Sequence, residues 1–264
     1  MNGMDDKIAL TGLVMVAAPI GEADKRLVLL TKERGKVTVF ARGARRPGNP
    51  FLAAANTFAF GTFFVQESRS AYRLAQAEIK NYFREISEDM ESACYGSYFL
   101  EFADYYAREN DDGTGLLQLL YAALRALLNP KLDNRLVRYV FELRAMTAGG
   151  EYPQVFQCAR CGSKEDLCAF LPEKSSVLCR KCAAEVPGHV NVQESAVYAM
   201  QYVITAPVGR LFAFALSEQV MKEFVREIDD FRRRYIDRQF KSLEILDMID
   251  MMQHARNALY KDGH

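Results

Sequence analysis

The chain of 264 residues contains no tryptophan and only three histidines, and its 34 basic residues are balanced by 34 acidic ones. It has no run of the 18 or more apolar residues that a membrane-spanning helix requires. Its start, MNGMDDKIAL, has acidic residues where a secretory signal would have basic ones. We therefore expect a cytoplasmic protein, in a compartment where paired cysteines bind metal more often than they form disulfides.

Common catalytic signatures are also missing. The chain contains no P-loop and no GxGxxG, HExxH or GxSxG pattern. His189 follows a Pro-Gly turn, His254 falls on an expected helix, and His264 is the last residue. The carboxylates accompany Lys and Arg on expected solvated helix faces, as in DDFRRR. We expect a protein that is not an enzyme.

Charge is distributed unevenly along the chain. Residues 1–80 contain 12 Lys and Arg against 7 Asp and Glu, a net charge of +5, whereas residues 81–264 contain 22 against 27, a net charge of −5. This asymmetry indicates a site for a polyanion in the first part of the chain and a different role for the rest.

The first 80 residues have the composition of strands. Five β-branched or aromatic-rich segments are separated by the turn-forming stretches PIGEAD, KERG, RRPGNP and ESRS, and the segments are 8–18, 26–31, 36–43, 57–66 and 72–79. Five short strands with no helical period between them are typical of a small closed barrel, of which the OB-fold is the commonest five-stranded version.

From about Tyr82 the apolar residues recur three and four positions apart, which predicts helices. The expected helices cover 92–107, 115–128, 134–148, 192–204 and 217–246. The fold is therefore α+β, with an N-terminal barrel over 1–80 and a helical domain over 81–155 and 187–264. A cysteine-rich segment over 156–186 interrupts the helical domain.

The cysteine-rich segment reads FQCARCGSKEDLCAFLPEKSSVLCRKCAAE and contains two CxxC pairs, Cys158 with Cys161 and Cys179 with Cys182. Their spacing matches a zinc ribbon or treble-clef-like finger, in which four thiolates surround one Zn²⁺ and leave no position open for a substrate. We predict a structural zinc, with plain buried thiols or an iron–sulfur cluster as alternatives. Cys168 and Cys94 lack ligand spacing and are interpreted as packing residues.

The stretch ARGARRPGNPF, residues 41–51, follows the third expected strand and clusters Arg42, Arg45 and Arg46. Gly43, Gly48 and Phe51 add backbone freedom and an aromatic ring. Guanidinium groups beside aromatic rings are typical of sequence-tolerant binding to single-stranded nucleic acid. The predicted DNA surface also includes residues of the preceding hairpin and of the fifth strand: Lys32, Arg34, Lys36 and Arg73. The alternative is an ordinary soluble loop.

A second basic group belongs to the acidic part of the chain. In DNRLVRYVFELRAM, a helix is expected from Asn134, capped by Asp133. Its arginines are Arg135, Arg138 and Arg144. We predict that they rim an apolar groove for a short acidic peptide with an apolar end. The alternative is that these arginines only pair with neighbours such as Glu142.

Several segments, in this order, resemble the RecO family of bacterial recombination mediators. The barrel segments ALTGLVMVAAPIGEADKRLVLLTKERGKVTVFARGARRP and NPFLAAANTFAFGTFFV carry the resemblance, supported by LVRYVFELRAM, the CxxC pairs and YIDRQFKSLEIL. Family members often have Lys where this chain has Arg42, which keeps the charge. Some members lack the cysteines, so the resemblance implies that the metal is structural.

The resemblance implies a non-enzymatic role in DNA repair and homologous recombination, in the cytoplasm at the nucleoid. RecO-like proteins bind single- and double-stranded DNA, anneal complementary strands and help to load recombinase at gaps. The implied partners are RecR and the C-terminal tail of the single-stranded DNA-binding protein. Arg135, Arg138 and Arg144 would bind this tail. The alternative function is a zinc-ribbon adaptor between proteins, with an SH3-like barrel and no direct binding of DNA.

Overall fold

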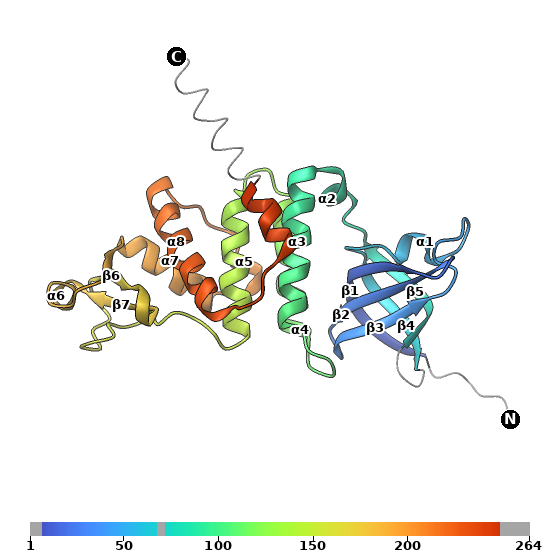
Figure 1. The fold of residues 1–264 in the computed structure, drawn as a ribbon, viewed down its shortest axis with the longest axis horizontal. Helices are drawn as coiled ribbons and strands as arrows, with labels where there is room; N and C mark the ends of the chain where they lie inside the picture. The colour runs from blue at the N-terminus through green and yellow to red at the C-terminus, as the bar shows by residue number, and fades with distance from the viewer. Residues whose placement is uncertain (1–6, 68–71, 249–264) are drawn as a thin grey trace, which may run out of the picture. The chain divides into compact units, whose positions relative to one another are not determined.

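The N-terminal part of the chain forms a closed five-stranded barrel (Figure 1). The computed structural model describes residues 7–67 and 72–248. The strands are β1 (Ile8–Ile20), β2 (Asp24–Thr31), β3 (Gly35–Ala41), β4 (Phe60–Glu67) and β5 (Tyr72–Asn81). They close in the order β1-β2-β3-β5-β4, with a short parallel pairing between β3 and β5 and antiparallel pairing elsewhere. The predicted OB-type barrel is confirmed.

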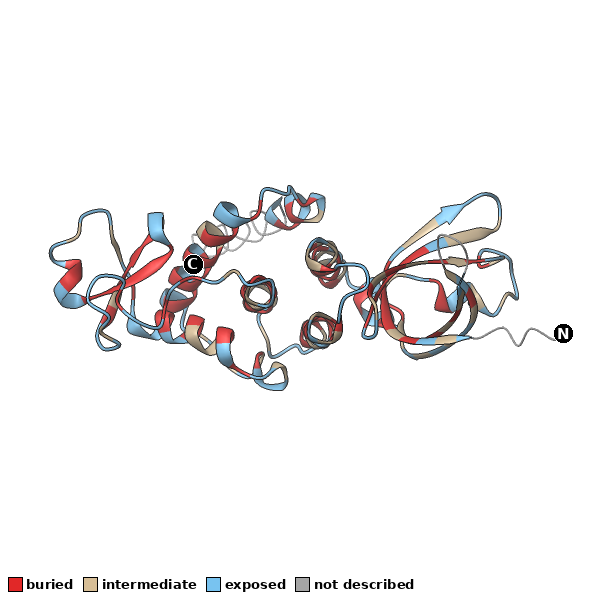
Figure 2. Cartoon of the chain, turned by 90° about the horizontal axis from the view of Figure 1, so that it is seen from below, coloured by how far each residue is buried: buried red, intermediate tan, exposed pale blue. Residues whose placement is uncertain are grey.

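Apolar residues at alternate positions fill the barrel, as the two-residue period of strands requires. In β3, for example, Val37, Val39 and Ala41 are buried and the residues between them are partly exposed. Figure 2 shows buried residues recurring along the strands of the barrel. A helix of one turn, α1 (Phe51–Ala54), lies between β3 and β4. It was not expected, and β4 begins three residues later than predicted because Phe58 adopts a left-handed backbone conformation (φ 72°).

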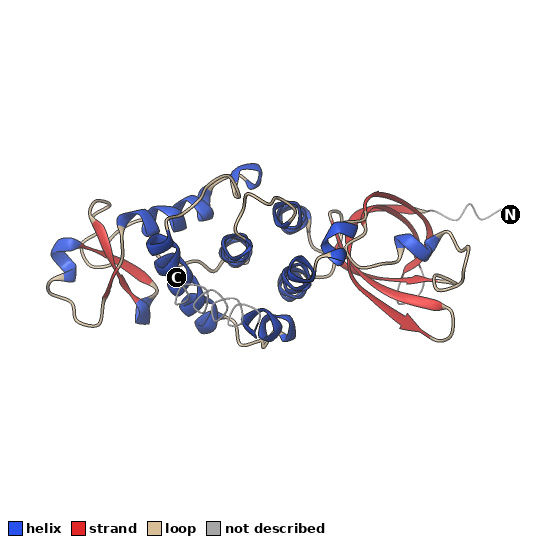
Figure 3. Cartoon of the chain, turned by 90° about the horizontal axis from the view of Figure 1, so that it is seen from above, coloured by secondary structure: helices blue, strands red, loops and turns tan. Residues whose placement is uncertain are grey.

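The chain after the barrel is mainly helical (Figure 3). Apart from a short helix over residues 84–88 that was not expected, the helices follow in the predicted order, and their bounds differ mainly at the ends. They are α2 (Arg84–Glu88), α3 (Met90–Tyr106), α4 (Thr114–Leu127), α5 (Asn134–Ala148), α7 (Glu194–Thr205) and α8 (Glu218–Tyr235), with a 3-10 turn η2 (Val208–Arg210). Side-chain oxygens cap three of the N-termini: Asp89 for α3, Asp133 for α5 and Ser217 for α8.

The cysteine-rich segment forms a three-stranded sheet in the order β7-β6-β8. Its elements are β6 (Leu167–Leu171), the 3-10 turn η1 (Pro172–Lys174), β7 (Ser176–Cys179), the short helix α6 (Arg180–Ala183) and β8 (Val190–Asn191). Because β8 belongs to this sheet, the segment continues to Asn191, five residues beyond its predicted end.

The predicted helix over 217–246 is wrong, because α8 ends at Tyr235 and Ile236 is extended (φ −117°). The chain turns helical again over 241–248. The Glu101 carboxylate accepts hydrogen bonds from the Ser242 N–H at 3.1 Å and its hydroxyl at 2.5 Å. The Phe240 ring packs against Phe102, with ring centroids 5.2 Å apart. Burial of Phe240 and capping by Glu101 outweigh continuation of α8.

The chain divides into two compact units. One extends from the N-terminus to Leu124 and includes the chain from Phe240, and the other is Arg125–Gln239. The barrel, α2 and α3 therefore belong to one unit, whereas α5, the cysteine-rich segment, α7 and α8 belong to the other.

The β2–β3 hairpin docks on the loop that follows α3. Three backbone hydrogen bonds hold it there: Lys36 N–H to Arg108 O at 2.8 Å, Asn110 N–H to Arg34 O at 3.0 Å and Gly113 N–H to Lys32 O at 3.1 Å. Gly35 permits this approach, because a Cβ on its backbone would lie 2.2 Å from the Arg108 carbonyl oxygen. Leu13 on β1 and Leu30 on β2 alternate with the residues that point into the barrel, so they belong to its outer face. Both are nevertheless fully buried.

We expect Gly35→Ala to destabilise the protein more than Gly21→Ala, its matched control in the preceding turn. Both glycines have a left-handed backbone (φ 60° and 55°), but a Cβ on Gly21 would meet nothing within 4 Å. The control should therefore lose only the conformational cost, about 1 kcal/mol. Gly35→Ala adds a clash with backbone and should lose about 3 kcal/mol. Urea unfolding measures both, and equal losses would contradict the close docking.

Candidate nucleic-acid interface and metal centre

A row of two arginines and one phenylalanine crosses the outer face of the barrel. Arg26 on β2 pairs with Phe40 on β3, and Phe40 pairs with Arg73 on β5. Paired residues point to the same side of a sheet, and neighbouring strands are about 4.8 Å apart, so the arginines flank the ring. Both arginines are exposed and Phe40 is half-buried. The row offers two cations for phosphates and a ring for a base.

The loop after β3, residues 42–50, adjoins this row. Arg42, Arg45 and Arg46 are exposed, and within residues 7–67 and 72–248 none of them forms an ion pair. The loop nevertheless has a defined shape, because the Asp24 carboxylate accepts a hydrogen bond from the Gly43 N–H at 2.7 Å. We call the surface of this loop and the row of Arg26, Phe40 and Arg73 the basic end of the barrel.

Arg45 holds the loop in place, and Lys25 binds the chain that follows α1. The Arg45 N–H donates to Ala23 O at 2.9 Å, and its guanidinium donates to two carbonyls of the β1–β2 turn. The Lys25 ammonium donates to Ala55 O at 2.9 Å. Burial, and then the charge of Arg45, lower the pKa of Lys25. Of the three arginines in the loop, Arg42 and Arg46 are therefore the ones whose guanidinium groups are not used to hold it.

The basic residues of the β2–β3 hairpin contact other groups of the protein. The Lys36 ammonium lies 3.1 Å from the Asp104 carboxylate of α3. Hydrogen bonds from Thr114, and to a lesser extent the charge of Lys32, lower the pKa of Asp112. The Arg34 guanidinium donates to the Tyr72 hydroxyl and lies 4.0 Å from Glu67.

The residues predicted to bind DNA thus form two groups rather than one surface. Arg42, Arg45, Arg46 and Arg73 lie at the basic end, where β3 finishes. Lys32 and Lys36 lie where β3 begins, about 20 Å from Arg42 along the strand. Arg34 belongs to the same hairpin, but its guanidinium reaches Tyr72, the neighbour of Arg73. Arg26 was missed, because its partner across the sheet is set by a strand register that the sequence does not reveal.

The four paired cysteines come together as predicted. The Sγ atoms of Cys158, Cys161, Cys179 and Cys182 all lie within 4.8 Å of one another, and this cluster could hold a metal ion. In the first knuckle, the Gly162 N–H donates to Cys158 O at 2.9 Å, and Gly162 is left-handed (φ 74°). In the second, Cys179 ends β7 and Cys182 lies on α6.

Local hydrogen bonds favour the thiolate form of Cys158, whereas burial, and then hydrogen bonds with the other three sulfurs, raise the pKa of Cys182 to about 12. Burial alone would raise the pKa of Cys158, but N–H groups of the two knuckles lower it to about 6. A lowered pKa suits a metal ligand, since the metal binds the thiolate. Cys168 lies at an irregularity of β6 opposite β7 and outside the cluster, and Cys94 lies on α3.

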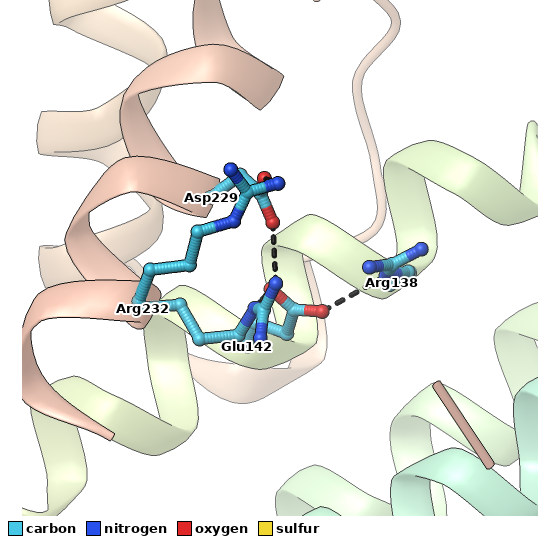
Figure 4. Close-up of polar contacts among 5 residues, drawn as sticks. Arg138, Glu142, Asp229 and Arg232 are labelled. Atoms are coloured by element: carbon cyan, nitrogen blue, oxygen red, sulfur yellow. Dashed lines mark hydrogen bonds and ion pairs between the residues drawn. The ribbon is translucent and has the colours of Figure 1, made fainter. Parts of the chain in front are cut away.

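The arginines of α5 do not rim a groove. The prediction is wrong for Arg138, which is 1% exposed and donates from Nε to the Glu142 carboxylate at 2.9 Å. Figure 4 shows Glu142 between Arg138 and Arg232, with Asp229 beyond. The Glu142–Arg232 distance is 3.5 Å and the Arg232–Asp229 distance is 2.5 Å.

The other two arginines of α5 have different surroundings. Arg144 donates to the carbonyl of Ile204 on α7, and burial lowers its pKa. Arg135 is partly exposed. The reason for the error is that Leu136, Val137 and Val140 are all buried, so α5 is an interior helix of its unit. An arginine in a helical sequence does not by itself reveal whether an ion pair is buried.

Comparison with known proteins covers most of the chain. Residues 4–83 match the family model described as Recombination protein O N terminal, and residues 87–244 match Recombination protein O C terminal. The chain belongs to the RecO family. It is 26% identical to the DNA repair protein RecO of Acetivibrio thermocellus over 92% of this chain and 97% of that protein. The protein of the same name from Symbiobacterium thermophilum is 31% identical, over 90% and 96%.

Membership of the RecO family places the chain among recombination and DNA repair proteins. The relative in Bacillus subtilis, also a DNA repair protein RecO, is 26% identical over 92% of this chain and 95% of its own length. In the part of the chain that the structure describes, no helix is both long and apolar enough to span a membrane.

We expect Glu142→Gln to destabilise this RecO-family protein strongly. The variant leaves Arg138 and Arg232 buried with one carboxylate fewer, and breaking a buried pair costs about 3–5 kcal/mol. The control is Glu218→Gln, which breaks the exposed pair with Lys222 and should cost less than about 0.5 kcal/mol. Urea unfolding of both proteins measures the difference. Similar small losses would show that the buried network contributes little to stability.

Proposed function

We propose that this protein is a non-catalytic factor of DNA repair and homologous recombination that binds DNA at the basic end of its barrel. The observation that supports this most is the cross-strand row of Arg26, Phe40 and Arg73 beside a loop whose three arginine side chains form no ion pair in the described residues. Guanidinium groups bind phosphates whatever the sequence, and an aromatic ring stacks on any base. Such a surface accepts both single strands and, through phosphate contacts, duplexes.

The chemistry of the basic end suits strand annealing. Contacts to phosphates and base faces leave the hydrogen-bonding edges of the bases free to pair with a second strand. Neutralising phosphates also reduces the repulsion between two strands. We propose that the protein anneals complementary strands in this way and helps to load recombinase at gaps.

The proposed partners besides DNA are RecR and the acidic tail of the single-stranded DNA-binding protein. They follow from the family resemblance. Arg138 is not part of this proposal, because its side chain is buried in the ion-pair network. Partly exposed Arg135 remains as a basic residue of α5 for an acidic tail, and Arg144 is held by carbonyls of α7.

We propose that the cysteine cluster binds one structural Zn²⁺. Tetrahedral zinc with sulfur ligands at about 2.3 Å requires sulfurs about 3.8 Å apart. The Sγ atoms lie within 4.8 Å of one another and those of Cys161 and Cys179 are 3.6 Å apart, so the four residues fit the ion with little movement. An iron–sulfur cluster places several atoms between its cysteines and requires more room. When bound, the zinc would tie the two knuckles together.

The DNA proposal predicts a specific change in salt dependence. We expect Arg26→Glu with Arg73→Glu to weaken binding of a mixed-sequence oligonucleotide and to flatten the slope of log K against log salt by about 2, because each lost phosphate contact removes nearly one unit. Phe40→Ala should weaken binding of single strands more than duplexes. Fluorescence anisotropy at several salt concentrations measures all of these.

The control for this experiment has the same change of charge elsewhere. Lys131→Glu with Lys174→Glu alters two exposed lysines of the other unit and should leave the slope unchanged. If both double variants weaken binding equally, the basic end is not the DNA surface. If the unaltered protein binds DNA weakly and without dependence on salt, the adaptor function becomes the better account.

The zinc proposal predicts one equivalent of zinc per chain by elemental analysis. Cys179→Ser should lose the zinc and make residues 156–191 sensitive to protease, because metal binding and local folding are coupled. Cys168→Ser should keep both the zinc and the resistance, since Cys168 lies outside the cluster. Protein purified without chelators that contains no zinc would contradict the assignment, as would retention of zinc by Cys179→Ser.

A further inference from the structure

The four clustered thiols differ sharply in exposure. Cys158, Cys179 and Cys182 are 2%, 4% and 8% exposed, whereas Cys161 is exposed. Cys161 lies at the outer turn of its knuckle, directly before Gly162, and a Cβ on Gly162 would meet no atom within 4 Å. The turn therefore faces open solvent. A small reagent dissolved in water can reach the sulfur of Cys161 before any other sulfur of the cluster.

Cys161 also has a close partner from the other knuckle. Its Sγ is 3.6 Å from the Sγ of Cys179. A disulfide has its sulfurs about 2.0 Å apart, so the two atoms need to approach by about 1.6 Å. Cys161 stands on a turn with open space around it, so this knuckle can supply the movement while the buried Cys179 stays at the end of β7.

We propose that the cysteine cluster is a reversible redox switch, in which a hydroperoxide oxidises Cys161 and a disulfide to Cys179 then releases the zinc. This inference rests on the proposed zinc site. In the first step the Cys161 thiolate attacks the terminal peroxide oxygen, the O–O bond breaks, and a sulfenic acid and an alcohol or water form. In the second step the Cys179 thiolate attacks the sulfenic sulfur and hydroxide leaves.

The two steps balance as a two-electron oxidation. Two thiolates, one hydroperoxide and two protons give one disulfide, one alcohol and one water; for hydrogen peroxide the products are two waters. The thiolates lose two electrons and the O–O bond takes them up. A dithiol reductant reverses the reaction by exchange with the disulfide, and zinc can then bind again.

The pairing across the knuckles has a structural consequence. Once Cys161 and Cys179 are joined, only Cys158 and Cys182 remain as ligands, and two thiolates do not complete a structural zinc site. The new bond nevertheless closes the chain from Cys161 to Cys179, which contains β6, η1 and β7. A disulfide within one knuckle would leave this hairpin open. The bond between Cys161 and Cys179 therefore keeps the chain that contains β6, η1 and β7 closed after the zinc has left.

Histidine replacements test the switch without removing a ligand. Cys161→His and Cys182→His each leave a Cys₃His set, which is a common structural zinc site. Each zinc-loaded protein is treated with hydrogen peroxide, and release is followed by a chromophoric zinc chelator. We expect Cys161→His to release zinc at least tenfold more slowly than the unaltered protein. Cys182→His is an equally altered ligand set that keeps Cys161 and Cys179, and it should release zinc at least tenfold faster than Cys161→His.

Peptide mapping by mass spectrometry identifies the bond that forms. We expect a Cys161–Cys179 disulfide in the treated protein, its loss after addition of dithiothreitol, and recovery of one equivalent of bound zinc. Cys168→Ser should change none of these results. Release from Cys161→His as fast as from the unaltered protein would overturn the proposal, and so would a Cys158–Cys161 bond. Absence of zinc before treatment would instead refute the proposed metal site.

Discussion

The two ends of the barrel differ because the β2–β3 hairpin, at one of them, docks on the loop after α3. Three backbone hydrogen bonds and the close approach at Gly35 fix this contact, and the Lys36–Asp104 ion pair adds to it. Because this end of the barrel is covered, its basic residues face acidic groups of the same unit. The opposite end, with Arg42 and Arg46, has no such cover in the described residues. A protein of zero net charge can in this way present a surface that attracts a polyanion.

The two proposed sites differ in how they are built. The metal centre depends on short stretches of chain, since each CxxC knuckle brings its own two sulfurs together and the β6–β7 hairpin brings the knuckles together. The basic end depends on contacts between distant residues, because Arg26, Phe40 and Arg73 meet only when three strands pair. Damage to the finger should therefore remain local. Damage to the barrel should remove the DNA surface.

This difference explains what could be predicted from the sequence. The five barrel strands, most helices and the clustering of the four paired cysteines follow from local period and spacing, and they were expected. Strands β6, β7 and β8 and helices α1 and α2 were not expected. The row of Arg26, Phe40 and Arg73 was not expected either, because register is decided by pairing across the barrel. Arg138 was misplaced because a buried ion pair has the same helical spacing as an exposed one. The end of α8 was missed because burial of Phe240 against Phe102 is a tertiary contact.

DNA is proposed to bind the basic end of the barrel and not the docked hairpin. Hydrogen–deuterium exchange measured by mass spectrometry, with and without a saturating mixed-sequence single strand, tests this proposal most directly. We expect slower exchange in peptides covering residues 24–26, 40–49 and 72–74, and no change over 32–36 or 107–113. Protection confined to 32–36 and 107–113, with none over 40–49, would contradict it.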